Sequence, residues 1–217
     1  MANRVALFGG SFDPIHLGHL WVAQHALEHL GVDQVVFLPA ATSPLKPNGP
    51  VASQADRLAM LQLALSKVVD ADGTRPMTID DREMHRGGVS YTVDTVEEIK
   101  RERGEVELFL LLGSDVLADF RRWHLPQKLL GLVTPAVYRR GGTAEIDWTV
   151  LEGLASQERI AEIRQSSLLI PMIELSSSDI RARIAAGRGI RFMVPDEVRR
   201  YIIDRSLYSR KITELGG

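Results

Sequence analysis

Two histidines near the start of the chain are the clearest candidates for chemistry. His16 and His19 are three residues apart at the expected start of a helix, so both imidazoles lie on one face and point toward the same loop. Gly9 and Gly10 stand between an apolar run and this helix, and such a pair lets backbone amides approach a phosphate closely. Two imidazoles beside a helix N-terminus therefore predict a site that stabilises an anion.

The segments around these residues predict a strand, a loop, a helix and a second strand. Residues 5–8 form a short apolar run, and residues 17–30 carry apolar side chains at near-helical spacing. Gly31 follows in the position that a helix C-cap prefers, and residues 34–38 resemble a buried strand. The N-terminal part therefore contains one β-α-β unit, for which a right-handed crossover is expected.

Strands and helices continue to alternate along the chain. We expect further strands at 77–79, 107–112, 133–138 and 168–173, and helices at 53–69, 92–103, 149–164, 177–186 and 195–205. Ser53 and Asp56 resemble a capping box at the start of one of these helices. The pattern predicts an α/β doubly wound parallel sheet of Rossmann-like type, as a single domain over 1–217 with a helical portion from about 175 to 210.

Ligands bind outside the carboxyl ends of the strands in such a sheet. Three segments of the sequence fall there: the glycine pair at 9–10, the proline-rich loop at 39–50, and residues 113–115. They are far apart in the sequence, and each follows a different predicted strand. We therefore expect them to meet in one binding site.

Composition excludes several classes of partner. The 217 residues carry a net charge of −2, which provides no overall basic field for long nucleic acids. The absence of cysteine removes disulfides and thiolate chemistry. The apolar stretches are too short to span a membrane, and the N-terminus has no targeting pattern. We expect a cytoplasmic protein without nucleic-acid or membrane partners, and the sequence leaves a homo-oligomer open.

Four ordered motifs resemble those of one enzyme family. The run 9–19 matches the pattern GGxFDPxHxGH, and residues 90–95 are similar to SYTxDT. Residues 113–123 are similar to a GxD...W segment, and residues 175–181 to ISSTxIR. The resemblance extends from Val5 to about residue 208. The sequence thus resembles the HxGH nucleotidyltransferases, and specifically the bacterial nicotinate-nucleotide adenylyltransferases.

This resemblance implies transfer of AMP from ATP to nicotinate mononucleotide, giving deamido-NAD and pyrophosphate in NAD biosynthesis. A phosphate oxygen of the mononucleotide attacks the α-phosphorus, so no protein nucleophile is required. Catalysis then depends on positioning and on stabilising charge. Mg²⁺ is expected to arrive with ATP, because the sequence has no carboxylate cluster typical of a dedicated magnesium site.

The resemblance also implies roles for individual residues. His19 would hold the α-phosphate and His16 the adjoining phosphates, while Lys46 and Arg181 would clamp the β- and γ-phosphates. The other implied ATP-binding residues are Gly9, Gly10, Ser11, Phe12, Gly18, Ser177 and Ser178. The implied acceptor-binding residues are Tyr91, Thr92, Asp115, Trp123 and Arg140.

Several of these residues have a plainer alternative. Trp123 would stack on the pyridine ring, but core packing is the commoner fate of tryptophan. Asp115 would meet a ribose hydroxyl or a metal-bound water, or simply cap a helix. The alternative for Arg181 is a surface salt bridge, and the alternative for Lys46 is a solvated lysine in a loop. Asp13 is expected to be structural and to hold its loop by Asx-type bonds.

The sequence departs from the family pattern in the loop 43–46 and in the turn 140–142. Leu45 stands where close relatives commonly have histidine, and Gly141 replaces the proline of an RPG turn. Ser178 replaces a threonine but keeps a hydroxyl. Two rival functions stay open: the same transfer to nicotinamide mononucleotide, and a non-catalytic nucleotide-binding regulator on the same fold. Phosphopantetheine and glycerol-phosphate relatives would not explain the SYTxDT and GxD...W segments.

The remaining histidines receive no catalytic role. His25 and His29 face away from His16 and lie two to three turns further along the helix. As an i, i+4 pair they could bind a metal, but we favour a solvated helix face. The spacing assigns no role to His85 or His124.

Overall fold

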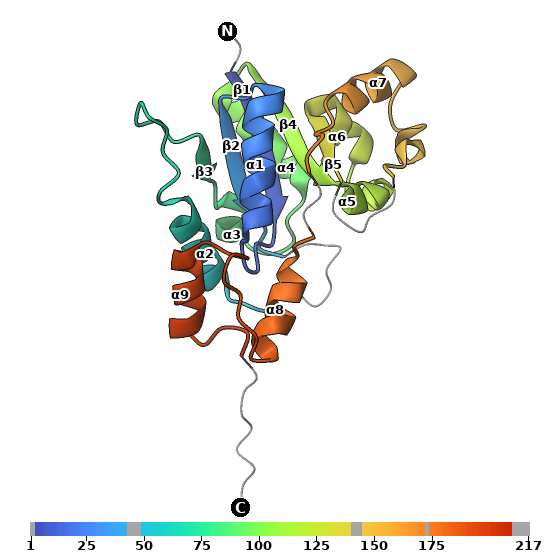
Figure 1. The fold of residues 1–217 in the computed structure, drawn as a ribbon. Coiled ribbons are helices and arrows are strands. Elements are labelled where there is room, and N and C mark those ends of the chain that lie inside the picture. Colours follow the sequence, from blue (N-terminus) through green and yellow to red (C-terminus); the bar gives the residue numbers. More distant parts are fainter. Residues whose placement is uncertain (1–2, 43–48, 140–144, 172–173, 210–217) are drawn as a thin grey trace, which may run out of the picture.

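The protein is built around a five-stranded, wholly parallel sheet in the order β3-β2-β1-β4-β5. The computed structural model describes residues 3–42, 49–139, 145–171 and 174–209 (Figure 1). The strands are β1 (Asn3–Gly10), β2 (Gln34–Pro39), β3 (Met77–Ile79), β4 (Val106–Gly113) and β5 (Thr134–Tyr138). The strand order reverses between β1 and β4, which is where such sheets open a ligand crevice. The predicted doubly wound parallel sheet is confirmed.

Both faces of the sheet are buried, which explains why the strands are almost continuously apolar. Phe8 of β1 points into a core shared with α1 (Leu17–Leu30), whereas its neighbour Leu7 points into a second core shared with α4 (Thr92–Arg103). Figure 1 shows these two helices on opposite faces of the sheet. Because side chains alternate along β1, the strand contributes residues to two separate apolar layers, one on each face of the sheet.

The other described helices complete the layers and the edge of the sheet. They are α2 (Gln54–Leu65), α3 (Arg82–Arg86), α5 (Ser114–Ala118), α6 (Pro126–Leu132), α7 (Gln157–Gln165), α8 (Ser177–Ala185) and α9 (Asp196–Asp204), with 3₁₀ turns at Phe120–Arg122 and Trp148–Leu151. Helices α8 and α9 lie beyond the carboxyl ends of the strands (Figure 1). They therefore stand at the edge where a ligand is expected.

Local signals at the helix ends are read correctly from the sequence. Gly31 ends α1 with the left-handed backbone (φ 58°) that glycine adopts without strain. The Ser53 hydroxyl accepts a hydrogen bond from the backbone N–H of Asp56 and so caps α2, as predicted. Helix α4 begins and ends at the predicted residues.

Other predicted elements are wrong in extent. Leu168 makes an isolated bridge to Tyr138, and the described residues 168–171 form no strand. The helix predicted over 149–164 divides into a 3₁₀ turn and α7, because Ser156 caps a new helix at that point. Helix α2 ends at Leu65, short of the predicted end. None of the helices in the described ranges is long and apolar enough to cross a bilayer.

Candidate active site

A cavity of about 490 Å³ opens at the carboxyl ends of the strands and brings most of the predicted site residues together. Its walls include Gly9, Gly10, Ser11, Phe12, His16, His19, Tyr91, Thr92, Asp115, Trp123, Ser177, Ser178 and Arg181. Gly18 lines a smaller cavity that shares His16 and His19 with the first. Lys46, Arg140 and the two family departures Leu45 and Gly141 lie outside the described residues.

The spacing of the first motif has a packing cause. Phe12 has a positive φ of 46°, a conformation that costs a non-glycine residue free energy, and its ring is buried beside His19 with centroids 5.1 Å apart. A Cβ atom on Gly10 would lie 3.1 Å from the Phe12 ring, and one on Gly18 would lie 3.1 Å from the His16 ring. Both glycines therefore make room for the aromatic side chains that shape the loop.

The two histidines form a stacked pair at the N-terminus of α1. Their ring centroids are 3.6 Å apart with an angle of 22° between the rings, and His16 is buried. The backbone N–H of His16 donates to Nδ1 of His19 at 3.2 Å. Because Nδ1 accepts, the neutral His19 ring carries its proton on Nε2. An Nε2–H donor beside the positive end of a helix dipole suits a phosphoryl oxygen.

Helix α8 contributes a cation to the described wall of the site. Arg181 donates to the backbone oxygen of Asp13 at 2.6 Å and to the Ser178 hydroxyl at 3.2 Å. The Ser177 hydroxyl donates to the backbone oxygen of Pro14 at 2.8 Å. These bonds fix the start of α8 on the loop of the first motif. Arg181 therefore lies at the cavity wall beside that loop, and its ion pair is with the buried carboxylate of Asp13 (3.7 Å), not with a surface residue.

Asp13 holds the loop to distant parts of the chain. Its buried carboxylate accepts from the backbone N–H groups of Val51 (2.7 Å) and Ala52 (3.1 Å) and from the Tyr208 hydroxyl (2.8 Å). The expected Asx-type local bonds are thus replaced by long-range ones. Burial is the main cause that raises the pKa of the Tyr208 phenol, and the negative charge of Asp13 is the second. The phenol therefore keeps its proton and acts as a donor.

Arg57 supports the same loop and was not predicted. It is fully buried in α2 and donates to the backbone oxygens of Ser11 and Ala40, each at 2.8 Å. Burial lowers the pKa of its guanidinium, and the negative charge of Asp13 opposes that shift. The sequence carried a signal: Arg57 occupies the apolar stripe of α2 together with Met60, one turn along.

An aromatic part of the cavity comes from the segment after α5. Trp123 packs on Phe120 with centroids 5.2 Å apart and also lines the cavity, so one part of its ring system packs in the core and another part faces the cavity. Its indole Nε1 is buried and has no hydrogen-bond partner among the described residues. His124 also lines the cavity, and its ring lies 4.5 Å from that of Tyr91. The sequence analysis assigned no role to His124, although its position next to Trp123 could have indicated that it lies in the same site.

Two carboxyl groups in the wall differ from expectation. Asp115 lies in the first turn of α5, but Gly113 is the N-cap, so the capping alternative for Asp115 is wrong. Glu83 was not predicted; it is buried in α3, and the Thr95 hydroxyl donates to it at 2.8 Å. Burial raises the pKa of Glu83, while the bond from Thr95 lowers it.

The cavity provides no dedicated metal cage in its described walls. The one described group of three histidine or acidic side chains that could hold an ion is His25, Glu28 and His29, and it lies outside these walls. A magnesium ion at the cavity would therefore depend on substrate phosphates and water for most of its ligands.

Known proteins are similar to this chain in sequence and in fold. A family model described as cytidylyltransferase-like matches residues 7–183. A relative from Rhodopirellula baltica is 46% identical over 95% of this chain and 94% of its own length, and one from Herpetosiphon aurantiacus is 39% identical over 95% and 98%. Both are named "Probable nicotinate-nucleotide adenylyltransferase".

A solved structure supports the fold. It is that of a Plasmodium falciparum nicotinic acid mononucleotide adenylyltransferase complexed with NaAD. It superimposes with a TM-score of 0.72 at 19% identity, covering 95% of this chain and 97% of that one. With the sequence relatives and the motif-lined cavity, the chain therefore belongs to the cytidylyltransferase-like family and, within it, to the nicotinate-nucleotide adenylyltransferases.

Proposed function

We propose that this protein transfers AMP from ATP to nicotinate mononucleotide, forming deamido-NAD and pyrophosphate. The observation that carries the proposal is a single cavity whose walls hold both a set of phosphate donors and an aromatic group. The donors include His19 and Arg181, and the aromatic side chains include Tyr91 and Trp123. The names of the relatives from Rhodopirellula baltica and Herpetosiphon aurantiacus support the same activity.

In the reaction, a phosphate oxygen of the acceptor forms a bond to the α-phosphorus of ATP. The bond from that phosphorus to the oxygen that bridges the α- and β-phosphates breaks, and pyrophosphate leaves with the electron pair. His19 donates its Nε2 proton as a hydrogen bond to an α-phosphoryl oxygen, and the N-terminus of α1 stabilises the same charge. Arg181 binds the departing phosphates. Positioning and charge stabilisation account for the catalysis.

The acceptor binds at the aromatic part of the cavity. The flat pyridinium ring stacks on Trp123, since a cationic heterocycle is attracted to an indole face. Thr92, at the first position of α4, and the neighbouring amides bind the carboxylate of the ring. Asp115 binds a ribose hydroxyl.

In this proposal Mg²⁺ would arrive with ATP and would neutralise charge on its phosphates. The described cavity wall holds no group of three histidine or acidic side chains that could bind the ion, so phosphate oxygens and water would provide most of its ligands. The cytoplasmic location and the lack of a nucleic-acid or membrane partner stay predictions from the sequence, and a homo-oligomer stays open.

One comparison tests the proposal. Purified protein is given ATP, Mg²⁺ and either nicotinate or nicotinamide mononucleotide, and pyrophosphate release is followed together with the mass of the dinucleotide product. We expect faster release with the nicotinate compound and a product of the mass of deamido-NAD. Equal or faster release with the nicotinamide compound would contradict the acceptor. No release with either would contradict the enzymatic function.

A further inference from the structure

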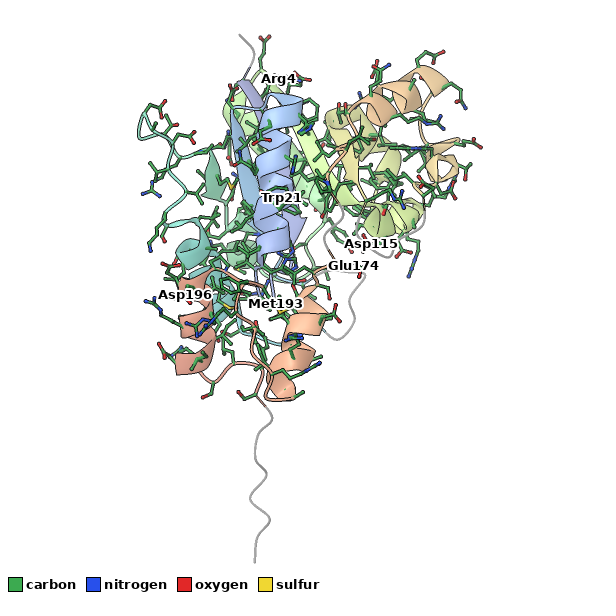
Figure 2. The ribbon with its side chains drawn as sticks, viewed as in Figure 1. Arg4, Trp21, Asp115, Glu174, Met193 and Asp196 are labelled. Carbon is green, nitrogen blue, oxygen red and sulfur yellow. The ribbon has the colours of Figure 1, made fainter. Side chains whose placement is uncertain are left out.

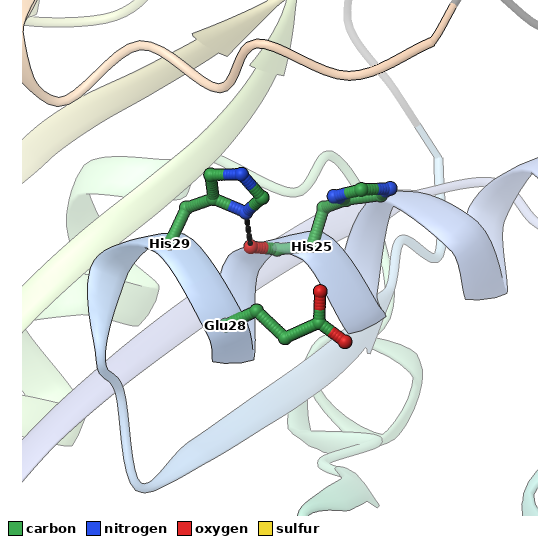
Figure 3. A group of neighbouring side chains, drawn as sticks. All are labelled: His25, Glu28 and His29. Atoms are coloured by element: carbon green, nitrogen blue, oxygen red, sulfur yellow. Dashed lines mark hydrogen bonds between the residues drawn. The ribbon is translucent and has the colours of Figure 1, made fainter.

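The last two turns of α1 carry His25, Glu28 and His29 as a cluster (Figure 3). Each side chain offers one ligand atom, and these atoms lie within 4.8 Å of one another. Glu28 and His29 are exposed and His25 is half-buried. We propose that this cluster binds a divalent transition-metal ion of the zinc class. The proposal does not rest on the transferase activity.

The hydrogen bond made by His29 leaves the right nitrogen for a metal. Its Nδ1 lies 3.0 Å from the backbone oxygen of His25, four residues earlier (Figure 3). A carbonyl oxygen can only accept, so Nδ1 carries the proton and Nε2 keeps its lone pair. Metal-binding histidines in proteins commonly have their second nitrogen bonded to a backbone carbonyl in this way, which fixes the tautomer and the ring.

The other two ligands are also oriented by neighbours. The Glu28 carboxylate accepts from the side-chain amide of Gln24 at 2.7 Å. The His25 ring packs edge-on against Trp21 with centroids 4.6 Å apart, and its Nδ1 is buried without a hydrogen-bond partner among the described residues. Part of the ordering that metal binding requires is therefore already present in the protein.

Two imidazoles and one carboxylate are the ligand set of many zinc sites that keep a water in the fourth position. Tetrahedral bonds of the usual length would bring the ligand atoms to about 3.3 Å from one another. The three residues lie at i, i+3 and i+4 on one helix face, and rotation of the exposed Glu28 and His29 side chains can close that distance. Nitrogen ligands disfavour Mg²⁺ and Ca²⁺, and the negative end of the helix dipole favours a cation.

The cluster is separate from the reaction centre. His25 follows His16 by nine residues, which corresponds to about 14 Å along a helix axis. A metal held here cannot touch the phosphates bound at the other end of α1. Zinc binding at this cluster and pyrophosphate release can therefore fail independently.

Calorimetric titration of the metal-stripped full chain with ZnCl₂ tests the site. The wild type is compared with His29→Ala and with a matched control, His85→Ala, which removes another exposed histidine that has an acidic neighbour four residues earlier. We expect one binding event that His29→Ala weakens by about tenfold or more and that His85→Ala retains. Equal affinity in the His29 variant, or affinity weaker than about 1 mM in the wild type, would overturn the proposal.

Trp21 provides an independent readout, because it is 40% exposed on α1 and touches His25 (Figure 2). Cu²⁺ binds such ligands more tightly than Zn²⁺ and quenches indole fluorescence at short range. We expect Cu²⁺ to quench the emission of Trp21 in the wild type. The Trp21→Phe variant lacks this part of the emission, and in His29→Ala the same Cu²⁺ concentration should leave it unquenched. Identical quenching curves for the wild type and His29→Ala would contradict the site.

Discussion

Helix α1 carries a histidine pair at each end, and the two pairs are prepared for opposite ligands. At the N-terminal end, Nδ1 of His19 accepts from a backbone N–H, so the ring presents an N–H donor. At the C-terminal end, Nδ1 of His29 donates to a backbone carbonyl, so the ring presents a lone pair. In the two proposals made above, one residue type therefore binds an anion at one end and a cation at the other, in the same sense as the helix dipole.

The surroundings of the two pairs differ as much as their tautomers. The N-terminal pair lies behind a loop held by buried polar groups, notably Asp13 and Arg57. The C-terminal pair lies on the outer face of the helix beside Glu28, and in this proposed metal cluster Glu28 and His29 are exposed. We therefore expect substitutions at the first end to affect activity or stability strongly, and those at the second end to matter only when a metal is present.

The largest effect is expected for His19→Ala. Loss of one preorganised donor to the α-phosphate should lower turnover by on the order of 10² or more, while the fold persists. Pyrophosphate release and thermal unfolding measure the two properties. The matched variant at the other end, His29→Ala, should keep its turnover. Near-normal turnover in His19→Ala would mean that this histidine does not contact the reacting phosphate.

The next effect is expected for Arg57→Met. The change leaves the partly buried backbone oxygens of Ser11 and Ala40 without their charged donor, which should lower the free energy of unfolding by about 2–4 kcal/mol. Urea unfolding measures the loss. Arg101→Met, on the exposed side of α4, serves as the control and should change it by less than about 0.5 kcal/mol. Equal losses in both variants would remove the special role of the buried arginine.

A pH-dependent effect is expected for Glu83→Gln. Burial raises the pKa of Glu83 in the folded protein above its value near 4.5 in the unfolded chain. The neutral carboxyl therefore makes its full contribution to the free energy of unfolding at pH values below 4.5. It is lost as pH rises through the higher folded pKa. Glutamine stays neutral, so the variant should gain free energy of unfolding relative to the wild type as pH rises. A difference that stays constant with pH would show that Glu83 ionises freely.

The smallest effect is expected for His29→Ala in the presence of a chelator. Its side chain is exposed, so the free energy of unfolding should change by less than about 0.5 kcal/mol. Added Zn²⁺ should raise the thermal midpoint of the wild type and not that of the variant, because a ligand stabilises only the state that binds it. A large loss of stability without metal would make this end of α1 structural.

The sequence predicts those parts of the site that are encoded locally. The bounds of α1 and α4 follow from apolar periodicity and from the glycine that comes directly after each helix, and the position of His16 and His19 on one face follows from helix geometry. The edge of the sheet where the segments meet follows from strand order, because parallel strands all end on one side.

What the sequence misses depends on contacts between distant segments. Arg57 and Glu83 have no motif of their own, and their burial is set by loops that meet in three dimensions. The five-residue helix α3 is too short to show a period. Asp115 looked like a cap because the sequence does not reveal that α5 begins one residue earlier. Histidine tautomers likewise depend on hydrogen-bond partners.

The bonds from Arg181 and Tyr208 to Asp13 have a consequence for biosynthesis. All five strands are complete by residue 138, but the loop that follows β1 receives its last partner 195 residues after Asp13. Because a chain emerges from the ribosome N-terminus first, the sheet can assemble while this loop still lacks its anchors. The loop after β1 is thus translated early but receives its hydrogen-bond partners late. A chain that ended before Tyr208 would contain all five strands, but Asp13 in this loop would lack the bond from Tyr208.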